Sequence, residues 1–522
     1  MIDPQKIPEE EKTPLVTELL HAVQALREDV QRLRDEIAHL KEHNGKPKIP
    51  PSRLEKDTKE KRKEKKGGKR PGSQKRSKTK DLPIHKTVPV PPKDIPPGST
   101  RVGHDDWIVQ GLEIRLHNVC YQLETWLTPD GTLIKGKLPA SVNGHFDATL
   151  QSFILQQYNH GHVTQPLIWE ELLDFGVDIS SGQVSRILTE QKDAFHLEKE
   201  GVLSAGLEVS DYINVDDTGA RHAGRNGYCT HIGNEFFAWF ESTGSKSRIN
   251  FLQLLRKGHG DYVINEDALS YIQRQSFPQP LLARLAEDAA KHLATAADWK
   301  QHLEQLGIKK DRHVKIATEG ALLGSVLYHG FSKELVILSD DAGQFNILLH
   351  ALCWIHAERT IHKLIGCSEE ERKAIEDIRD RIWEFYRELK TYKEMPDEET
   401  KLALEARFNE IFATETCSAV LDAALRRVAR NKDELLLVLD RPDIPLHNNL
   451  SERDIREYVK KRKISGSTRS DNGRRCRDTF TSLKKTCRKL GVSFWGYLND
   501  RVSNAGEIPP LPDLIRARAR SS

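Results

Sequence analysis

Hydrophobic residues near the start of the chain recur with the seven-residue period of a coiled coil. Over residues 15–41 one core position is β-branched and the other is leucine: Val16, Val23, Val30 and Ile37 alternate with Leu19, Leu26, Leu33 and Leu40. β-Branched residues at the first position and leucine at the second favour a parallel two-stranded coiled coil. The pattern predicts a coiled coil over residues 15–44 that joins two protomers through residues 16–40. A single amphipathic helix packed on its own domain is the alternative.

The pattern changes twice after this helix. Residues 45–81 are poor in hydrophobic residues and rich in lysine, glycine and serine, which predicts a basic, disordered linker. Residues 82–142 begin as proline-rich chain and continue with short alternating stretches at 107–109 and 113–116 and a turn at 129–131. These stretches predict a small β module.

Helical periodicity follows in residues 143–208. Residues 167–173 form an apolar helix that Gly176 ends, and Ser180 or Ser181 then caps a second helix. A helix, a short turn with glycine and a capped helix outline a helix-turn-helix DNA-binding domain. Many helical hairpins have the same outline, so a plain helical domain is the alternative.

Residues 209–505 predict a ribonuclease-H-like catalytic domain. Three apolar runs, 212–216, 228–232 and 235–240, are separated by turns and predict adjacent antiparallel strands, the first ending in an acid. Residues 335–339 predict a further strand. The interval of 112 positions from Asp340 to Glu452 predicts a helical insertion. Residues 506–522 are expected to form a C-terminal tail. The chain is therefore expected to be a multidomain α+β protein.

Charge is distributed unevenly along the 522 residues, although the net charge is only +3. Residues 45–80 hold 16 lysines and arginines against 4 acids, and residues 453–489 hold 14 against 4. Two basic blocks on an otherwise acidic chain favour a nucleic-acid partner. A solvated linker and a charged surface helix are the alternative.

Composition also excludes several classes of protein. The chain has no run of 18 apolar residues to span a membrane, and its first residues lack the pattern of a signal peptide. Its seven cysteines are odd in number and form no Cys-x-x-Cys pair, which argues against a disulfide framework. We therefore expect a cytoplasmic protein with no membrane partner.

Three acidic residues have the placement that a metal-dependent nuclease requires. Asp216 and Asp340 each end an apolar run, and Glu452 lies where a helix begins. Two strand ends and one helix can bring three carboxylates into one pocket, and divalent cations would neutralise their repulsion. Two such ions, about 3.5–4 Å apart, can activate a nucleophile and stabilise a leaving oxygen in phosphodiester cleavage.

Ordinary structural roles are open for the same residues. An acid after an apolar run is often a strand-end turn or a helix cap. Asp217 and Asp341 could each replace their neighbours as ligands. Successive side chains of a strand point to opposite faces, so only one of each pair should face the site.

The stretches around the acids resemble the insertion-sequence-66 family of bacterial DDE transposases. Residues 215–219 (Val-Asp-Asp-Thr-Gly) resemble the first-acid motif. Residues 338–343, followed by Cys-Trp-x-His-x-x-Arg at 353–359, resemble the second. Residues 448–456 resemble the third, and the likeness continues through 470–474 to Leu498. It covers roughly residues 145–505.

The resemblance implies that Asp216, Asp340 and Glu452 are the catalytic triad and hold two Mg²⁺ or Mn²⁺ ions. It implies a supporting or DNA-phosphate role for His356 and Arg359, for which helix packing is the alternative. The basic residues after Glu452 are expected to bind DNA: Arg453 and Arg456 through phosphates of the cleaved strand, and Lys460, Lys461, Arg462 and Lys463 through non-specific attraction.

The chain departs from the family in one respect. Many members have a cysteine-rich, zinc-finger-like segment before the helical region, but residues 82–140 contain only Cys120, so no zinc is predicted. We expect a transposase that cleaves transposon ends and joins the freed 3′-hydroxyl to target DNA, with accessory proteins a further possibility. A non-catalytic DNA-binding protein derived from a transposase and a structural coiled-coil protein are the alternatives.

Overall fold

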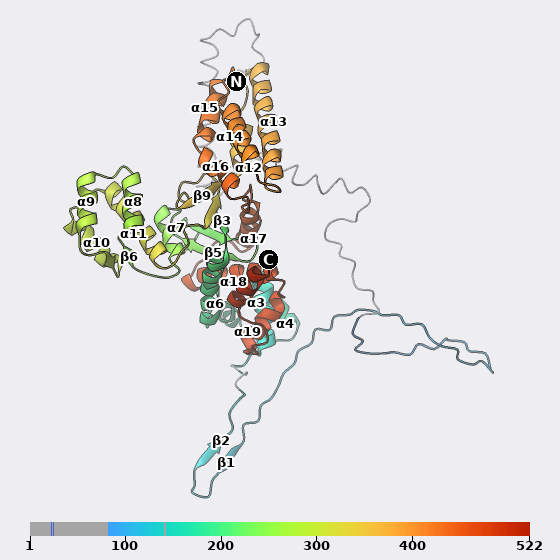
Figure 1. Ribbon diagram of the computed structural model, residues 1–522. Helices are drawn as coiled ribbons and strands as arrows, with labels where there is room; N and C mark the ends of the chain where they lie inside the picture. The colour runs from blue at the N-terminus through green and yellow to red at the C-terminus, as the bar shows by residue number, and fades with distance from the viewer. Residues whose placement is uncertain (1–21, 23–24, 26–81, 140–141, 143, 522) are drawn as a thin grey trace.

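The computed structural model describes residues 22, 25, 82–139, 142 and 144–521. Figure 1 shows a central sheet with one helical lobe above it, a second lobe to its left and a helical body below it. This mixture confirms the expected α+β class. The predicted coiled coil and basic linker lie outside the described residues, apart from Ala22 and Ala25. Among the helices that the structure describes, none is long and apolar enough to cross a membrane.

The central sheet has five strands in the order β5-β4-β3-β8-β9. Strands β3, β4 and β5 are antiparallel, whereas β8 and β9 run parallel to β3. The strands are β3 (Tyr212–Gly219), β4 (Tyr228–Gly233), β5 (Ala238–Thr243), β8 (Val336–Ser339) and β9 (Leu349–Leu352). The predicted strands are confirmed, although the third begins three residues later than expected because Gly233 and Asn234 make a wider turn.

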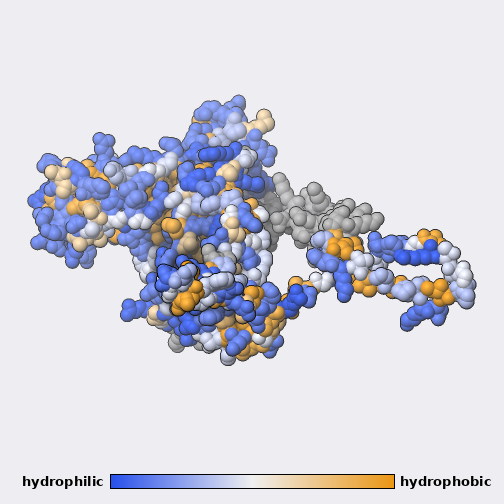
Figure 2. All heavy atoms as spheres, turned by 90° about the horizontal axis from the view of Figure 1, so that it is seen from below, coloured by the Kyte–Doolittle hydropathy of each residue, from blue (hydrophilic) through white to orange (hydrophobic). Residues whose placement is uncertain are grey.

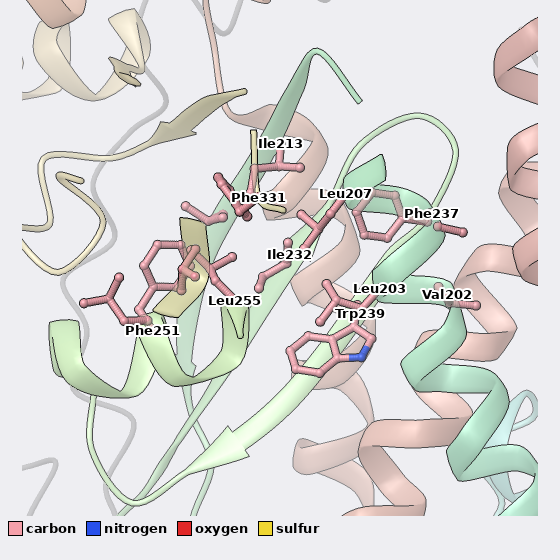
Figure 3. Close-up of a cluster of buried hydrophobic side chains, with 14 of the residues drawn as sticks. Val202, Leu203, Leu207, Ile213, Ile232, Phe237, Trp239, Phe251, Leu255 and Phe331 are labelled. Atoms are coloured by element: carbon pink, nitrogen blue, oxygen red, sulfur yellow. The ribbon is translucent and has the colours of Figure 1, made fainter. Parts of the chain in front are cut away.

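The two faces of β3 have different partners. Ile213 and Val215 point into a hydrophobic core with helices α6 (Asp193–Val209) and α7 (Arg248–Leu255), part of which Figure 3 shows. Asn214 and Asp216 alternate with them and therefore lie on the opposite face. Helix α17 (Asn449–Ser465) packs on that face, where Tyr458 stacks on Phe240 at 6.0 Å between ring centroids. The face that carries Asp216 is thus the face that α17 covers.

The outer edge of β5 is bonded to helix α18 (Asp471–Leu490) rather than left open. The backbone amides of Ala238, Phe240 and Ser242 donate to the side chains of Thr486, Ser482 and Asp478 at 3.1, 2.9 and 2.9 Å. Every second strand residue meets every fourth helix residue because two strand steps, about 6.6 Å, nearly equal four helix steps, about 6 Å. The helix satisfies the donors that an edge strand exposes.

The body below the sheet combines helices from both ends of the described chain. Its N-terminal part has α3 (Ala148–Asn159), α4 (Gln165–Asp174), α5 (Ser181–Thr189) and α6. The predicted turn is confirmed: Gly176 has a φ of +82°, and Ser180 accepts a hydrogen bond from the amide of Gln183. Helices α4 and α5 therefore have the outline of a helix-turn-helix, while DNA binding by them stays a prediction.

The C-terminal part differs from the expected tail. Helices α19 (Phe494–Ser503) and α20 (Leu511–Arg520) complete the body, and α20 packs along α6. Leu511 and Ile515, one turn apart, are fully buried, and Arg516 pairs with Glu208 at 2.9 Å. The apolar stripe of α20 is short and lies among arginines, so its pattern did not predict a packed helix. It fixes this helix to the body.

Two helical insertions flank the sheet. The left lobe of Figure 1, between β5 and β8, follows α7. It contains β6 (Tyr262–Val263), α8 (Glu266–Arg274), α9 (Gln279–Glu287), β7 (His292–Leu293), α10 (Ala296–Gln305) and α11 (Asp311–Tyr328). The upper lobe is the insertion predicted before Glu452. It contains α12 (Trp354–His362), α13 (Glu369–Tyr392), α14 (Glu398–Phe412), α15 (Ala419–Ala429) and α16 (Lys432–Asp440).

Residues 82–139 form an extended arm in place of the expected β module. Their regular structure is one hairpin of β1 (Thr125–Leu127) and β2 (Leu133–Lys135), and residues 107–109 and 113–116 are not strands. Figure 2 shows apolar residues along this arm, and Trp107 is 91% exposed. A hairpin of two short strands has no second layer on which to bury an apolar face, so alternation alone does not build a module.

Candidate active site

Asp216 and Asp340 occupy equivalent places on neighbouring parallel strands. The β3–β8 register pairs Asn214 with Leu338, and each aspartate follows its paired residue by two positions. The two side chains therefore leave the same face of the sheet at the same level. This register brings together two of the three predicted acids although 124 residues separate them in the sequence.

The two carboxylates are half-buried, and they lie close enough for the charge of Asp340 to act on Asp216. Burial raises the pKa of Asp216 to about 7, and the charge of Asp340 contributes to the rise. A nearby cation would have the opposite effect, because it favours the ionised form. Burial also raises the pKa of Asp217, although its hydrogen bonds with Thr230 and Gln344 oppose the rise.

The alternative ligands Asp217 and Asp341 are engaged with other groups. Asp217 accepts hydrogen bonds from Thr230 at 2.5 Å and from Gln344 at 3.0 Å, one to each carboxylate oxygen. Asp341 is exposed and pairs with Arg427 at 2.9 Å and with Asn431 at 3.2 Å. These contacts favour Asp216 and Asp340 as the members of each pair that face the site.

Glu452 lies in the first turn of α17, among cationic side chains. Its Oε1 is 3.4 Å from Arg359 and 3.7 Å from His356, and its Oε2 is 3.7 Å from Arg456. Burial opposes a charged imidazole, but the Cys353 side chain and the carboxylates of Glu452 and Asp340 raise the pKa of His356 to about 9. His356 therefore interacts with carboxylates of both Glu452 and the aspartate pair.

These residues fit a divalent cation in part. Carboxylate oxygens are the ligands that Mg²⁺ prefers, and Asp216 and Asp340 form a half-buried pair of carboxylates. However, no three His, Cys, Asp or Glu side chains of the described residues gather closely enough to hold a metal ion. Asp216 and Asp340 could hold one ion as they stand, whereas Glu452 is held by Arg359 and His356.

The basic residues of α17 divide between its surface and its buried face. Arg453, Arg456, Lys460 and Lys463 are exposed, at spacings that place them along one side of the helix. Lys461 differs from its prediction: it is 3% exposed, donates to the carbonyl of Tyr158 and lies 3.2 Å from the centre of that ring. Arg462 is half-buried and donates to the carbonyl of Gly219. Their positions along the helix place these two residues on the side of α17 that packs against the rest of the protein.

A buried charged cluster that the sequence analysis did not single out fixes α17 on the sheet. Asp454 pairs with Lys485 at 2.8 Å and with Lys489 at 2.7 Å, and its Oδ2 is 3.3 Å from His231 of β4. His231 also bonds to Ser451 at 2.7 Å. The i, i+4 spacing of the two lysines was a weak signal, but their partner lies too far away in sequence to be inferred.

Comparison with known proteins identifies the family of this chain. A sequence model described as "Transposase IS66 family" matches residues 309–475, which contain Asp340, His356, Arg359 and Glu452 but not Asp216. A relative named "Uncharacterized protein y4jO", from Sinorhizobium fredii (strain NBRC 101917 / NGR234), is 46% identical over 321 residues. That match covers 61% of this chain and 100% of the relative. The chain therefore belongs to the IS66 family of transposases.

Proposed function

We propose that this transposase is a DDE enzyme that cleaves DNA at transposon ends and joins the freed 3′-hydroxyl to target DNA. The observation that carries the proposal is the shared register of Asp216 and Asp340 on one sheet face, with Glu452 beside them across His356. The chain would use no nucleophilic side chain of its own, since water and the 3′-hydroxyl are the nucleophiles.

The sheet supports a ribonuclease-H-like catalytic domain. Three antiparallel strands are followed by two strands parallel to the first, in the order β5-β4-β3-β8-β9. The acids lie on the first strand, directly after the fourth, and on a later helix that packs against the first. This is the arrangement expected when two strands and one helix each contribute one carboxylate.

Divalent ions, Mg²⁺ or Mn²⁺, would supply Lewis-acid activation of the nucleophile and stabilisation of the leaving oxygen. Asp216 and Asp340 would hold an ion in the state described, and Glu452 would complete a two-ion site after release from Arg359. His356 and Arg359 would then contact a DNA phosphate, since an arginine binds phosphate as it binds carboxylate. Both residues thus hold the third acid without DNA and contact the substrate with it.

The exposed side of α17 is the proposed path of the DNA backbone. Its four basic residues extend over ten positions, about 15 Å of helix, which matches roughly four phosphates at 3.4 Å of axis each. Beyond its end the 466–470 loop is bonded to the β3–β4 turn, where the amide of Ala223 donates to Thr468 at 2.9 Å. Arg225 and Arg469 are exposed there and continue the basic surface.

Assembly is proposed to follow from the N-terminal heptads. A parallel coiled coil over residues 16–40 would join two protomers, and pairing of two transposon ends requires at least two catalytic sites. Recognition of the ends is assigned to the α4–α5 pair, whose second helix carries Gln183 in its first turn and Arg186 in its last. Accessory transposition proteins and association with the nucleoid belong to the same proposal.

A strand-transfer assay tests the function. Purified protein, DNA that carries the transposon ends and Mg²⁺ should give joined products, and Asp216→Asn or Asp340→Asn should abolish them while DNA binding is retained. Asp341→Asn is the matched control, because Asp341 pairs with Arg427 on the surface. Full activity of Asp216→Asn would overturn the proposal.

The incomplete metal group favours a second candidate, a non-catalytic DNA-binding protein derived from a transposase. It predicts that the unmodified protein binds end DNA but forms no products with Mg²⁺ or Mn²⁺. The same assay separates the two functions.

A further inference from the structure

Asn448, the residue before α17, uses its side chain outside its own helix. Its amide nitrogen donates to the carbonyl of Val215 at 2.8 Å, and its amide oxygen accepts from Asn214 at 2.8 Å. Asn448 and Asn214 are each 1% exposed. Both partners lie on β3 immediately before Asp216, so the side chain joins the start of α17 to the strand that carries the first acid.

The position of Asn448 makes this use informative. Asparagine is among the residues that best cap a helix N-terminus through the side-chain oxygen. At the start of α17 no side-chain capping bond is present. The helix therefore lacks the stabilisation of a side-chain cap. The nitrogen and the oxygen of the Asn448 side-chain amide both form hydrogen bonds with β3 instead. A residue chosen to start a helix would bond to the amide two or three positions later.

Backbone bonds extend the link to the other two acids. The amide of Asn448 donates to the Cys353 sulfur at 3.2 Å, and the amide of Cys353 donates to the carbonyl of Ser339, the residue before Asp340, at 3.0 Å. The carbonyl of Asn448 accepts from the amide of Glu452 at 3.3 Å. Each acid is therefore one residue or one hydrogen bond away from this network.

We propose that Asn448 is a positioning residue that sets the spacing of the three carboxylates by holding β3, the end of β9 and the start of α17 in one register. This inference rests on the proposed function, since it assigns Asn448 a role in that site. Side chains that support ligands from behind commonly change metal affinity or activity 10–100-fold when removed. Their effect differs from a loss of folding because it falls on the metal and the chemical step.

The test compares Asn448→Ala with Asn234→Ala. Asn234 is also 1% exposed; its side chain donates to the carbonyl of Tyr212, at the other end of β3, and to the hydroxyl of Ser210, where none of the three predicted acids lies. Mn²⁺ affinity is measured by calorimetry, the strand-transfer rate and the KM for end DNA by assay, and stability by thermal unfolding. Asn448→Ala should weaken Mn²⁺ binding about tenfold or more and lower kcat with KM for DNA unchanged. Asn234→Ala should lower the unfolding temperature alone.

A second variant guards against misfolding. Asn448→Asp keeps the acceptor for Asn214 but loses the donor to Val215, so it should shift Mn²⁺ affinity in the same direction. Equal Mn²⁺ affinity in the Asn448 variants and the unmodified protein would overturn the inference, as would losses that match those of Asn234→Ala. If the unmodified protein binds no Mn²⁺ and Asp216→Asn leaves its activity intact, the proposed function itself has failed.

Discussion

Asp216 and Asp454 are acids in one domain, the first half-buried and the second buried, with opposite surroundings. Asp454 lies between His231, Lys485 and Lys489; burial alone would raise the pKa of Asp454, but these partners hold it well below its usual range. Asp216 faces Asp340, and its pKa is raised. Asp454 thus has the partners of a structural acid, whereas the pKa of Asp216 stays raised and an added cation would lower it.

A raised pKa alone does not distinguish these roles. Burial and the charge of Glu241 raise the pKa of Asp478 to about 7, yet Asp478 accepts hydrogen bonds from the backbone and hydroxyl of Ser242 at the edge of β5. Asp216 differs because it faces a second carboxylate in register on a neighbouring strand. The pKa values of the two aspartates are similar, so their positions in the fold, and not their pKa values, distinguish their roles.

The largest expected effect comes from Asp216→Asn. Strand transfer should fall on the order of 10³-fold or more, because a neutral amide cannot help to hold a cation as a carboxylate does. Chemical unfolding should show little loss of stability, since the substitution also relieves repulsion from Asp340. Large destabilisation together with normal activity would show that Asp216, like Asp454, is a structural acid.

Asp454→Asn should show the opposite pattern. Removal of one partner of a buried ion pair costs about 3–5 kcal/mol, because Lys485 and Lys489 would keep uncompensated charge. Urea unfolding at neutral pH measures the loss, and activity should fall only as the folded fraction falls. Asp443→Asn, which breaks a more exposed pair with Arg441, is the control and should cost less than about 1 kcal/mol.

Asp478→Asn tests the intermediate case through pH. A carboxyl whose pKa rises from 3.8 to about 7 on folding binds more protons in the folded state, so stability falls as pH rises through this interval. The loss is at most about 4 kcal/mol. The variant should lack this part of the pH dependence and keep its activity when folded. An unchanged profile would show that Asp478 is ionised across the interval.

The smallest effect concerns the surface of α17. Lys460→Gln together with Lys463→Gln should lower the slope of log affinity against log salt by about two, roughly one per lost phosphate contact. Lys461→Met is the matched control: Lys461 is buried against Tyr158, so its removal should leave the slope unchanged. A larger slope change for Lys461 than for its neighbours would contradict the assigned orientation of the helix.

The strands and their acids were predictable because they depend on local patterns. Apolar runs marked β3 and β8. Asp340 directly follows β8 as expected, whereas Asp216 lies inside β3, three residues before the end of that strand. The position of Glu452 followed from its place at the start of a helix. These features required no knowledge of distant contacts.

Features that depend on distant partners were not predictable. In the run Lys460–Lys463 only the packing of α17 on the body shows which lysine is buried, since Tyr158 lies 303 positions from Lys461. The role of Asn448 likewise depends on a strand more than 200 residues earlier. Residues 107–116 show the opposite error: their alternating pattern predicts strands, but among the described residues no neighbouring strand lies beside them.

The bonding of α18 to β5 has a consequence for shortened copies of this gene. The segment that matches the family model ends at residue 475, the fifth residue of α18, before any of the three side chains that bond to β5. A product that stopped there would carry bare strand amides ready to recruit another polypeptide. We expect such truncated products to aggregate through this edge rather than compete with the intact transposase for DNA.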